Sequence, residues 1–226
     1  MHTLAPVLEC RSIDKNYDLR PVLKAVSLRL FSGERLALMG PSGSGKTTLL
    51  NCLGGIDRPD SGSIWIGGED LTQMDGDALA MLRRRRVGNI FQFFHLLPTL
   101  SVRENVGFPL VMLGVSAAEA RERVGKLLER VKIAHRGDAL PSQLSGGEMQ
   151  RCAIARALVH EPEVILADEP TGNLDSVNSA NILKLLEELT GETSTALVLV
   201  THSEEAARIC QRVVTIRDGE LEEGRG

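Results

Sequence analysis

The sequence predicts an α/β fold, in which helices cover both faces of a parallel sheet. Two short runs, 164–167 and 196–200, consist almost entirely of aliphatic residues, and a third, 35–39, leads directly into a glycine-rich loop. Apolar runs without alternation are typical of strands that are buried on both faces. Segments with helical patterns follow these strands, at 47–53, 177–189 and 204–210. This alternation of strand and helix is the pattern of a parallel sheet.

Length and composition fit a single globular domain. The 226 residues can bury one substantial core, and 42% hydrophobic with 25% charged residues is typical of a folded, soluble chain. The formal net charge of −4 provides no global basic field, so nucleic acid is not an expected partner. No run approaches the roughly 18 apolar residues of a membrane helix. The first residues also lack the pattern of a signal peptide, so we expect a cytoplasmic protein.

The N-terminal third predicts a small antiparallel lobe. Segments 7–13, 22–30 and 64–66 have strand character and lie close together along the chain. The stretch 60–63 has the composition of a turn. Within the second segment, residues 26–30 alternate between apolar and polar side chains, which indicates a strand with one face in water.

The middle of the chain predicts a helical insert. From about residue 100 to residue 160 no segment has a strand pattern. Two stretches, 101–104 and 116–119, begin with serine and end with glutamate, as do capping boxes that open helices. We therefore expect one domain, 1–226, made of an α/β core with the antiparallel lobe (about 1–92 and 161–226) and a helical subdomain (93–160).

The glycine-rich loop after 35–39 matches the pattern GxxxxGK[ST], in which backbone amides at a helix start surround phosphates. Lys46 would reach the β- and γ-phosphates of a nucleotide, and the Thr47 hydroxyl would bind Mg²⁺. The alternative is a glycine-rich turn matched by chance, against which the strand before and the helix after the loop both argue. The expected nucleotide ligands here are Gly40, Pro41, Ser42, Gly43, Ser44, Gly45, Lys46, Thr47 and Thr48.

Two acidic residues follow the apolar run 164–167. Parallel α/β sheets bind ligands at the C-terminal ends of their strands, where Asp168 and Glu169 are expected to lie. Asp168 suits the outer shell of Mg²⁺, through water, and Glu169 could orient or deprotonate an attacking water. The alternative is an ordinary acidic strand end that caps a helix.

A second anion-binding segment occurs at 144–151, Leu-Ser-Gly-Gly-Glu-Met-Gln-Arg. A serine and two glycines at a helix start present backbone amides to an anion. Two such sites in one chain make little sense for a single nucleotide, but they fit two chains that face each other and each complete the other's site. The alternative is a plain serine N-cap with flexible glycines. The expected ligands are Ser145, Gly146, Gly147 and Glu148.

Together these segments resemble the ATP-binding cassette (ABC) ATPases over essentially the whole chain. The phosphate loop, the signature motif at 144–150 and the second Walker motif ending at Asp168 and Glu169 fit that family in order. The resemblance implies a P-loop NTPase with a RecA-like parallel sheet that hydrolyses ATP with Mg²⁺. The resemblance further implies that Gln92 belongs to the glutamine loop and that 173–175 form the loop that contacts the opposite subunit. His202 matches the switch histidine, and Tyr17 is similar in position to the residue that stacks on adenine.

The family mechanism gives these residues roles. Two cassettes pack head to tail, and each ATP lies between the phosphate loop of one copy and the signature motif of the other. Glu169 acts on the water, His202 contacts the γ-phosphate, and Gln92 senses Mg²⁺ and the water. For Tyr17, packing within the antiparallel lobe is the alternative to stacking on adenine. The expected catalytic residues are Glu169, His202, Gln92 and Lys46, and the expected metal ligands are Thr47, Gln92 and Asp168.

The segment after Gln92 is rich in large apolar residues. Such residues either fill the helical subdomain or dock a partner. In the family, this region forms the groove that receives a coupling helix of a membrane permease, which implies docking near Phe94, Leu96, Leu97 and Leu100. Four arginines, 83–86, close a predicted helix. A solvated last turn is one interpretation of them, and contact with lipid headgroups or a permease is the other.

Two stretches, 90–100 and 167–175, resemble a subgroup of these ATPases that serves lipoprotein-releasing, macrolide-exporting and cell-division systems. The chain is therefore expected to drive a permease from the inner face of the cell membrane. The alternative is a cell-division type of ATPase, which regulates a membrane scaffold without transport. DNA-repair and translation ABC ATPases fit less well, because they carry tandem cassettes or coiled-coil insertions.

Overall fold

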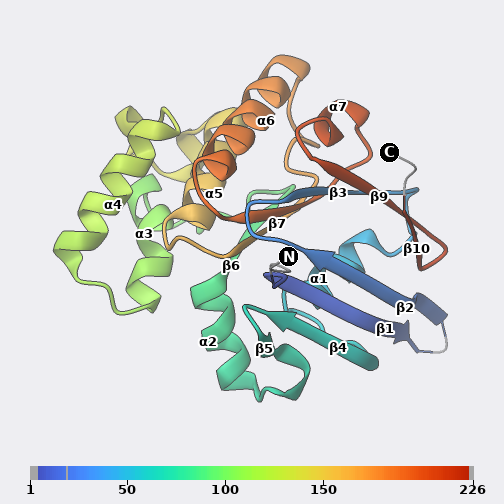
Figure 1. Ribbon diagram of the computed structural model, residues 1–226. Coiled ribbons are helices and arrows are strands. Elements are labelled where there is room, and N and C mark those ends of the chain that lie inside the picture. Colours follow the sequence, from blue (N-terminus) through green and yellow to red (C-terminus); the bar gives the residue numbers. More distant parts are fainter. Residues whose placement is uncertain (1–4, 19, 224–226) are drawn as a thin grey trace.

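The computed structural model describes residues 5–18 and 20–223, which form two sheets with helices around them (Figure 1). The larger sheet has six strands in the order β10-β9-β3-β8-β7-β6. Neighbours in this sheet pair in parallel except β9 and β10, which are antiparallel. The strands are β3 (Arg35–Met39), β6 (Val87–Phe91), β7 (Val164–Asp168), β8 (Ala196–Val200), β9 (Arg212–Arg217) and β10 (Glu220–Glu223). The predicted parallel α/β core is confirmed.

The smaller sheet is the predicted antiparallel lobe, in the order β2-β1-β4-β5. Its strands are β1 (Leu8–Tyr17), β2 (Arg20–Leu30), β4 (Ser61–Ile66) and β5 (Glu69–Asp70). Residues 26–30 of β2 alternate between buried and exposed, as their sequence predicts. The predicted turn at 60–63 is wrong in part, because Ser61, Gly62 and Ser63 belong to β4. Gly62 has a φ of +83° opposite an irregularity in β1, so this glycine serves a bulge.

Helices follow most strands of the core and fill the middle of the chain. They are α1 (Lys46–Leu53), α2 (Gly76–Arg86), α3 (Val102–Met112), α4 (Ala117–Arg130), α5 (Gly146–Leu158), α6 (Ser176–Gly191) and α7 (Glu204–Ala207). Short 3-10 turns lie at η1 (Leu71–Gln73), η2 (Ala134–Arg136) and η3 (Pro141–Gln143). The segment between β6 and β7 contains helices but no strand, all of it within the described residues. The helix predicted at 204–210 ends at Ala207.

The two predicted capping boxes differ. Ser101 and Glu104 form both reciprocal hydrogen bonds at the start of α3. Ser116 caps α4, but Glu119 forms an ion pair with Arg123 in place of the return bond. The second capping box is therefore only half present, although the helix start that it predicts is confirmed.

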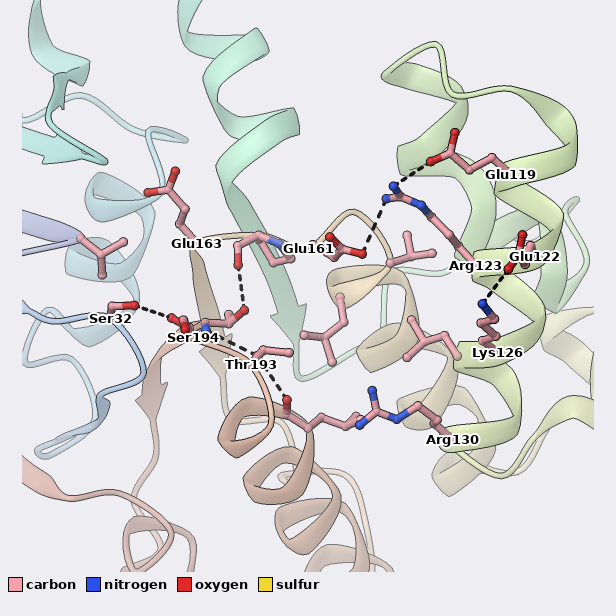
Figure 2. Close-up of a pocket in the computed structure, with 17 residues that line it drawn as sticks. Ser32, Glu119, Glu122, Arg123, Lys126, Arg130, Glu161, Glu163, Thr193 and Ser194 are labelled. Atoms are coloured by element: carbon pink, nitrogen blue, oxygen red, sulfur yellow. Dashed lines mark hydrogen bonds and ion pairs between the residues drawn. The ribbon is translucent and has the colours of Figure 1, made fainter.

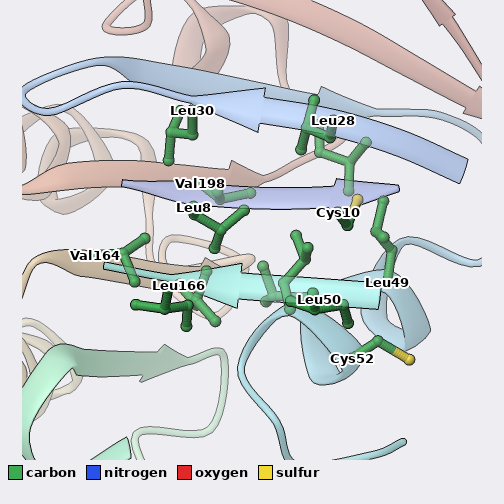
Figure 3. Close-up of a cluster of buried hydrophobic side chains, with 14 of the residues drawn as sticks. Leu8, Cys10, Leu28, Leu30, Leu49, Leu50, Cys52, Val164, Leu166 and Val198 are labelled. Carbon is green, nitrogen blue, oxygen red and sulfur yellow. The ribbon is translucent and has the colours of Figure 1, made fainter. Parts of the chain in front are cut away.

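Two apolar clusters cover the two faces of the parallel sheet. Side chains alternate along β7, so that Val164 and Leu166 join one cluster while Ile165 and Ala167 join the other. The first cluster lies against α1 and the antiparallel lobe (Figure 3), and the second lies under α3, α5 and α6. Burial on both faces is what the unbroken apolar runs predict. This burial on both faces fixes the positions of the strand ends that carry the candidate site. Within 5–18 and 20–223, no helix combines the length and apolar character needed to cross a bilayer.

Candidate functional site

The C-terminal ends of four strands surround one cleft. The phosphate loop follows β3, Gln92 follows β6, Asp168 and Glu169 stand at the end of β7, and His202 follows β8. The cleft has a volume of about 440 Å³. Its lining consists of Val22, Gly40, Pro41, Ser42, Gly43, Gly45, Lys46, Thr47, Thr48, Gln92, Asp168, Glu169 and His202. Every predicted catalytic and metal-binding residue therefore lies in this cleft, and Val22 is an addition that its sequence did not reveal.

The phosphate loop is shaped by glycines in left-handed conformation. Gly40 has a φ of +146°, and a Cβ there would lie 2.2 Å from the Ile216 carbonyl oxygen. Gly45, with a φ of +106°, precedes α1 and has no side chain to cap it, which leaves the first amides of the helix for an anion. The buried Ser44 hydroxyl has no hydrogen-bond partner among the described residues. Lys46 Nζ donates to the Gly40 and Pro41 carbonyl oxygens, both at 2.8 Å. The loop thus holds donors that a phosphate chain could accept.

The candidate metal ligands meet at the base of the cleft. Thr47 Oγ1 donates to Asp168 Oδ2 at 3.0 Å, joining the start of α1 to the end of β7. Burial raises the pKa of Asp168, and the charge of Glu169 raises it further, whereas the hydrogen bond from Thr47 and the charge of Lys46 lower it. A carboxylate that burial disfavours in its charged form is stabilised by a cation. A hydroxyl beside a carboxylate is a donor set that Mg²⁺ accepts together with phosphate oxygens, so these residues fit a magnesium ion.

Glu169 is held in a defined position beside His202. Its Oε1 lies 2.7 Å from His202 Nδ1, and the Thr201 hydroxyl donates to its Oε2 at 3.5 Å. The backbone of Glu169 has a φ of +45°, and its N–H donates to the Val200 carbonyl oxygen at 3.0 Å. This left-handed conformation is strained for a residue other than glycine, and residues with such strain are common at functional sites. The bend after β7 turns the carboxylate into the cleft.

Gln92 connects the cleft to the loop before α6. Its Nε2 donates to Asn173 Oδ1 at 3.4 Å, and Asn173 Nδ2 donates to the Gln92 carbonyl oxygen at 2.9 Å. These two residues are 81 positions apart, so their contact is a result of the fold. It joins the glutamine loop to the segment of this chain that, by the family resemblance, contacts the opposite subunit.

The second anion-binding segment lies outside the cleft. Ser145 caps α5 with a complete capping box, in which Glu148 Oε2 accepts from the Ser145 N–H at 2.8 Å. Neither of these residues, nor Gly146 or Gly147, is among the described residues that line the cleft. A Cβ on Gly147 would lie 3.0 Å from Asn178 Oδ1, so the segment stands beside the start of α6. Each chain thus carries the two anion-binding segments apart from each other.

Glu148 should stabilise the start of α5, in a way that depends on pH. Hydrogen bonds from the Ser145 backbone and from Arg136 lower its pKa from 4.5 to about 2. Its stabilising effect is therefore complete above pH 4.5 and lost as the pH falls towards 2. Glu148→Ala should lower the free energy of unfolding by about 1–2 kcal/mol. Glu148→Gln, which can keep the cap but not the charge, should lose less.

The check is denaturant unfolding at a series of pH values. The difference in stability between the wild type and Glu148→Gln should be constant above pH 5 and shrink below pH 4.5. A difference independent of pH would show that the carboxylate charge contributes nothing.

Tyr17 lies at the end of β1 and not in the lining of the cleft. Its side chain is 46% exposed. The hydroxyl donates to Asp57 Oδ2 at 2.5 Å, and Lys15 Nζ lies 5.2 Å from the ring centroid. The ring is thus fixed at one edge and open to solvent. This geometry leaves it accessible for stacking on a base, which stays a prediction.

A larger cavity, of about 890 Å³, lies away from the cleft, between α4, the end of α6 and the loop before β7 (Figure 2). Two of its basic side chains pair with glutamates of the same lining: Arg123 with Glu119 at 2.7 Å, and Lys126 with Glu122 at 2.6 Å. None of the candidate site residues belongs to its described lining. The predicted catalytic and metal-binding residues therefore lie in the smaller cleft and not in this larger cavity.

Comparisons with known proteins agree with this site. A model of the family described as ABC transporter matches residues 23–172. The lipoprotein-releasing system ATP-binding protein LolD of Pseudomonas syringae is 46% identical over 221 residues, which cover 96% of this chain and 97% of that protein. The macrolide export ATP-binding/permease protein MacB of Syntrophobacter fumaroxidans is 47% identical over 222 residues, 96% of this chain but only 31% of that protein.

Solved structures give the same result. The dimeric structure of a post-hydrolysis state of the ATP-binding cassette MJ0796, bound to ADP and Pi, is 38% identical in sequence. It superposes with a TM-score of 0.88 over 97% of this chain and 99% of that one. The family match spans the phosphate loop, the signature motif and both acidic residues at the end of β7. The chain therefore belongs to the ABC transporter family, as a cassette that binds and hydrolyses ATP.

Proposed function

We propose that this chain is the ATPase subunit of a membrane complex of the lipoprotein-releasing type, and that it works as a homodimer on the inner face of the membrane. The observation that carries the proposal is the separation of the Ser145 segment from the cleft that holds Lys46, Asp168 and Glu169. Similarity to LolD over 96% of the chain supports the choice of system. A macrolide-export type is the related alternative, because MacB matches at 47% identity and LolD at 46%.

In the proposed mechanism, each residue of the cleft has one task. Lys46 leaves its own loop carbonyls and donates to the β- and γ-phosphates, whose oxygens accept more strongly. Thr47 and Asp168 would hold Mg²⁺, with Gln92 beside them, and a bound ion would supply positive charge where negative charge develops on the phosphates. Glu169 orients the attacking water and takes its proton. Positioning and charge stabilisation of this kind account for most of the catalysis of phosphoryl transfer.

His202 keeps Glu169 in place before ATP binds, through the 2.7 Å contact with Oε1. When a γ-phosphate enters the cleft, the imidazole can turn to it and release the carboxylate for the water. Ser145, Gly146 and Gly147 of the second copy then close the other side of the nucleotide with the amides of α5. Tyr17 supplies the surface on which adenine stacks.

A groove on the outer surface is the proposed docking site for the permease. It has a volume of about 380 Å³ and lies between α2, β6, α3 and α5. Phe91, Phe108, Pro109 and Met112 give it an apolar side. The residues near which docking is predicted, Phe94, Leu96, Leu97 and Leu100, are close in sequence to the groove but do not line it. Leu97 is 38% exposed, and Phe94 and Leu100 are half-buried. Leu96 packs against the second apolar cluster.

Replacing Phe108 and Met112 together with Glu should reduce recovery of the permease at least about tenfold, because the docked segment would lose its apolar contact. The two side chains lie one helical turn apart and are 40% and 39% exposed. Val111→Glu is the matched control, since Val111 lies on the same helix, is 68% exposed and is not among the residues of the groove. Pull-down from solubilised membranes measures recovery, and thermal unfolding verifies that each variant folds. Equal recovery in all three proteins would refute docking here.

Co-purification tests the function itself. A four-span permease with a large periplasmic domain, recovered with the chain, would support lipoprotein release or export. Recovery of a division protein in its place would favour the alternative, an ATPase that regulates a membrane scaffold. A chain that hydrolyses ATP but recovers neither would contradict the proposal.

A further inference from the structure

A small polar network holds the ring of Tyr17 at the end of β1. The Tyr17 hydroxyl donates to Asp57 Oδ2 at 2.5 Å, and the other carboxylate oxygen, Oδ1, lies 3.0 Å from Lys15 Nζ. The same ammonium group donates to the Arg58 carbonyl oxygen at 2.8 Å and lies 5.2 Å from the centroid of the Tyr17 ring. One carboxylate thus connects the hydroxyl of Tyr17 with the cation that lies against its ring.

The cation of this network is buried although the ring beside it is open to solvent. Lys15 is 9% exposed, whereas Tyr17 is 46% exposed. A lysine is almost never buried without a partner. Burial lowers the pKa of Lys15, but the hydrogen bond and the charge of Asp57 raise it overall. Burial likewise raises the pKa of Asp57, while its hydrogen bonds with Tyr17 and Lys15 lower it overall. Both groups are therefore charged at neutral pH, and each fixes the position of the other.

The network is attached to the helix that begins at the phosphate loop. The Asp57 N–H donates to the carbonyl oxygen of Asn51 in α1 at 3.2 Å. Helix α1 starts at Lys46, and Thr48 in its first turn lines the cleft. The hydrogen bond to Asp57 and burial raise the pKa of Tyr17, whereas a hydrogen bond with the Thr48 hydroxyl lowers it. The position of the ring is thus set from the same helix that presents its first amides to the phosphates.

Lys15 also affects the ring electronically. The faces of an aromatic ring carry negative charge, which disfavours direct face-to-face contact with another π-system. A cation against one face attracts that charge, so the opposite face repels a stacked base less. With the Lys15 ammonium group on one side of the Tyr17 ring, the opposite face is the one left for a base.

We propose that Asp57 and Lys15 are positioning residues for ATP, which hold the Tyr17 ring where adenine stacks on it. This inference rests on the proposed function, which assigns the stacking to Tyr17. Ordering a free side chain when a ligand binds costs conformational entropy. Because the chain itself holds the hydroxyl and one face of this ring, the base meets a surface that is already ordered. Asp57 and Lys15 should therefore raise the affinity for ATP without acting on the phosphates or on the attacking water.

The alternative is that the network only stabilises the antiparallel lobe. Asp14 provides the matched control, because its carboxylate accepts from the Ala25 N–H at 2.9 Å and from the Ser61 hydroxyl at 2.6 Å. It belongs to the same sheet, and within the described residues it forms neither a hydrogen bond nor an ion pair with Tyr17 or Lys15. Tripolyphosphate provides the matched ligand, since it has the phosphate chain of ATP but no adenine.

The test measures KM and kcat for Mg-ATP in the full chain, together with the inhibition constant of magnesium tripolyphosphate. Asp57→Ala should raise KM about three- to tenfold and leave both kcat and the inhibition constant within about twofold, because only the base loses a contact. Lys15→Met, which keeps the stem and loses the charge, should raise KM about two- to fivefold. Asp14→Ala should match the wild type in all three quantities.

A double-variant cycle tests whether Asp57 acts through Tyr17. Tyr17→Phe keeps the ring and loses the hydroxyl, so it should raise KM as well. Combined with Asp57→Ala, it should be no worse than Asp57→Ala alone, since both changes remove the same bond. Asp57→Asn retains an oxygen that can accept from the hydroxyl, so its KM should lie between those of the wild type and Asp57→Ala. Thermal unfolding verifies that each variant folds.

Four results would overturn the inference: a wild-type KM in Asp57→Ala, equal losses of affinity for ATP and tripolyphosphate, the same rise of KM in Asp14→Ala, or additive losses in the double variant. The proposed function is tested apart from these by Tyr17→Ala. If Tyr17→Ala raises KM while any of the four results is found, stacking on Tyr17 stands and the inference alone fails. If Tyr17→Ala keeps the wild-type KM, the stacking fails and the inference fails with it.

Discussion

Replacing Glu169 with Gln should lower ATP turnover on the order of a hundredfold or more while ATP binding is retained. The amide has nearly the same shape but cannot accept the proton of the attacking water. Glu169 lies at the bend after β7, 2.7 Å from His202. Among the described residues its carboxylate accepts hydrogen bonds from Thr201 and His202 and none from the phosphate loop. The nucleotide should therefore bind, bring two copies together and remain unhydrolysed.

Phosphate release measures the turnover, and size-exclusion chromatography with Mg-ATP measures the dimer. Glu204→Gln is the matched control, since Glu204 is an exposed carboxylate just beyond His202 that does not line the cleft in the described structure. It should hydrolyse ATP like the wild type and show no accumulated dimer. A Glu169→Gln protein that turns over normally would remove the water-activating role.

The strands that the sequence predicts best are those whose burial is complete. β7 up to Ala167 and all of β8 are continuous apolar runs, since the two faces of each strand pack against different clusters. In β3, Leu36, Ala37 and Leu38 are all fully buried. β6 was missed because Gly88 and Asn89 interrupt its pattern. A Cβ at Gly88 would lie 2.3 Å from the Ala157 carbonyl oxygen, so this position requires glycine where α5 crosses the strand. Such a reason depends on a residue about seventy positions away and has no local signal.

In the candidate site, too, the residues with a local sequence pattern are predicted, and those that act through distant contacts are not. Motifs report side chains that act on a ligand, and all the predicted catalytic residues line one cleft. Motifs do not reveal the side chains that hold distant segments of the protein together. The Thr201 hydroxyl at Glu169, the Asn173 amide at Gln92 and the Arg156 guanidinium at Phe94 are contacts between distant segments. They become visible only when the strand ends are brought together.

The docking surface is an intermediate case. The apolar stretch after Gln92 indicates either a filled interior or contact with a partner, and the structure divides its residues between the interior and the surface. Leu96 packs against the second cluster, whereas Phe108, which is more distant in sequence, lines the groove. Hydrophobic character alone does not distinguish these two outcomes. Within α3, Val106 is fully buried and Phe108 is 40% exposed, because the two side chains leave the helix in different directions.

Replacing Lys46 with Ala should weaken Mg-ATP binding and lower turnover by on the order of a hundredfold or more, with little loss of fold stability. Without nucleotide, Lys46 Nζ only donates to the Gly40 and Pro41 carbonyl oxygens. Losing these two bonds at a partly exposed site should cost about 1–2 kcal/mol. With nucleotide, the same ammonium group would face the β- and γ-phosphates, so its removal acts mainly on the bound state.

The difference between free and bound states makes thermal unfolding a direct measurement. A ligand that binds only the folded chain raises the melting temperature, so Mg-ATP should raise that of the wild type and leave Lys46→Ala nearly unchanged. Lys46→Arg keeps the charge, but the guanidinium group is planar and larger than the ammonium group. It should not fit between the Gly40 carbonyl oxygen and a phosphate, so this variant should not restore turnover. A Lys46→Ala protein stabilised by Mg-ATP as strongly as the wild type would show that the backbone amides of α1 and the loop suffice to hold the nucleotide. Lys46 would then act, if at all, only on the transition state.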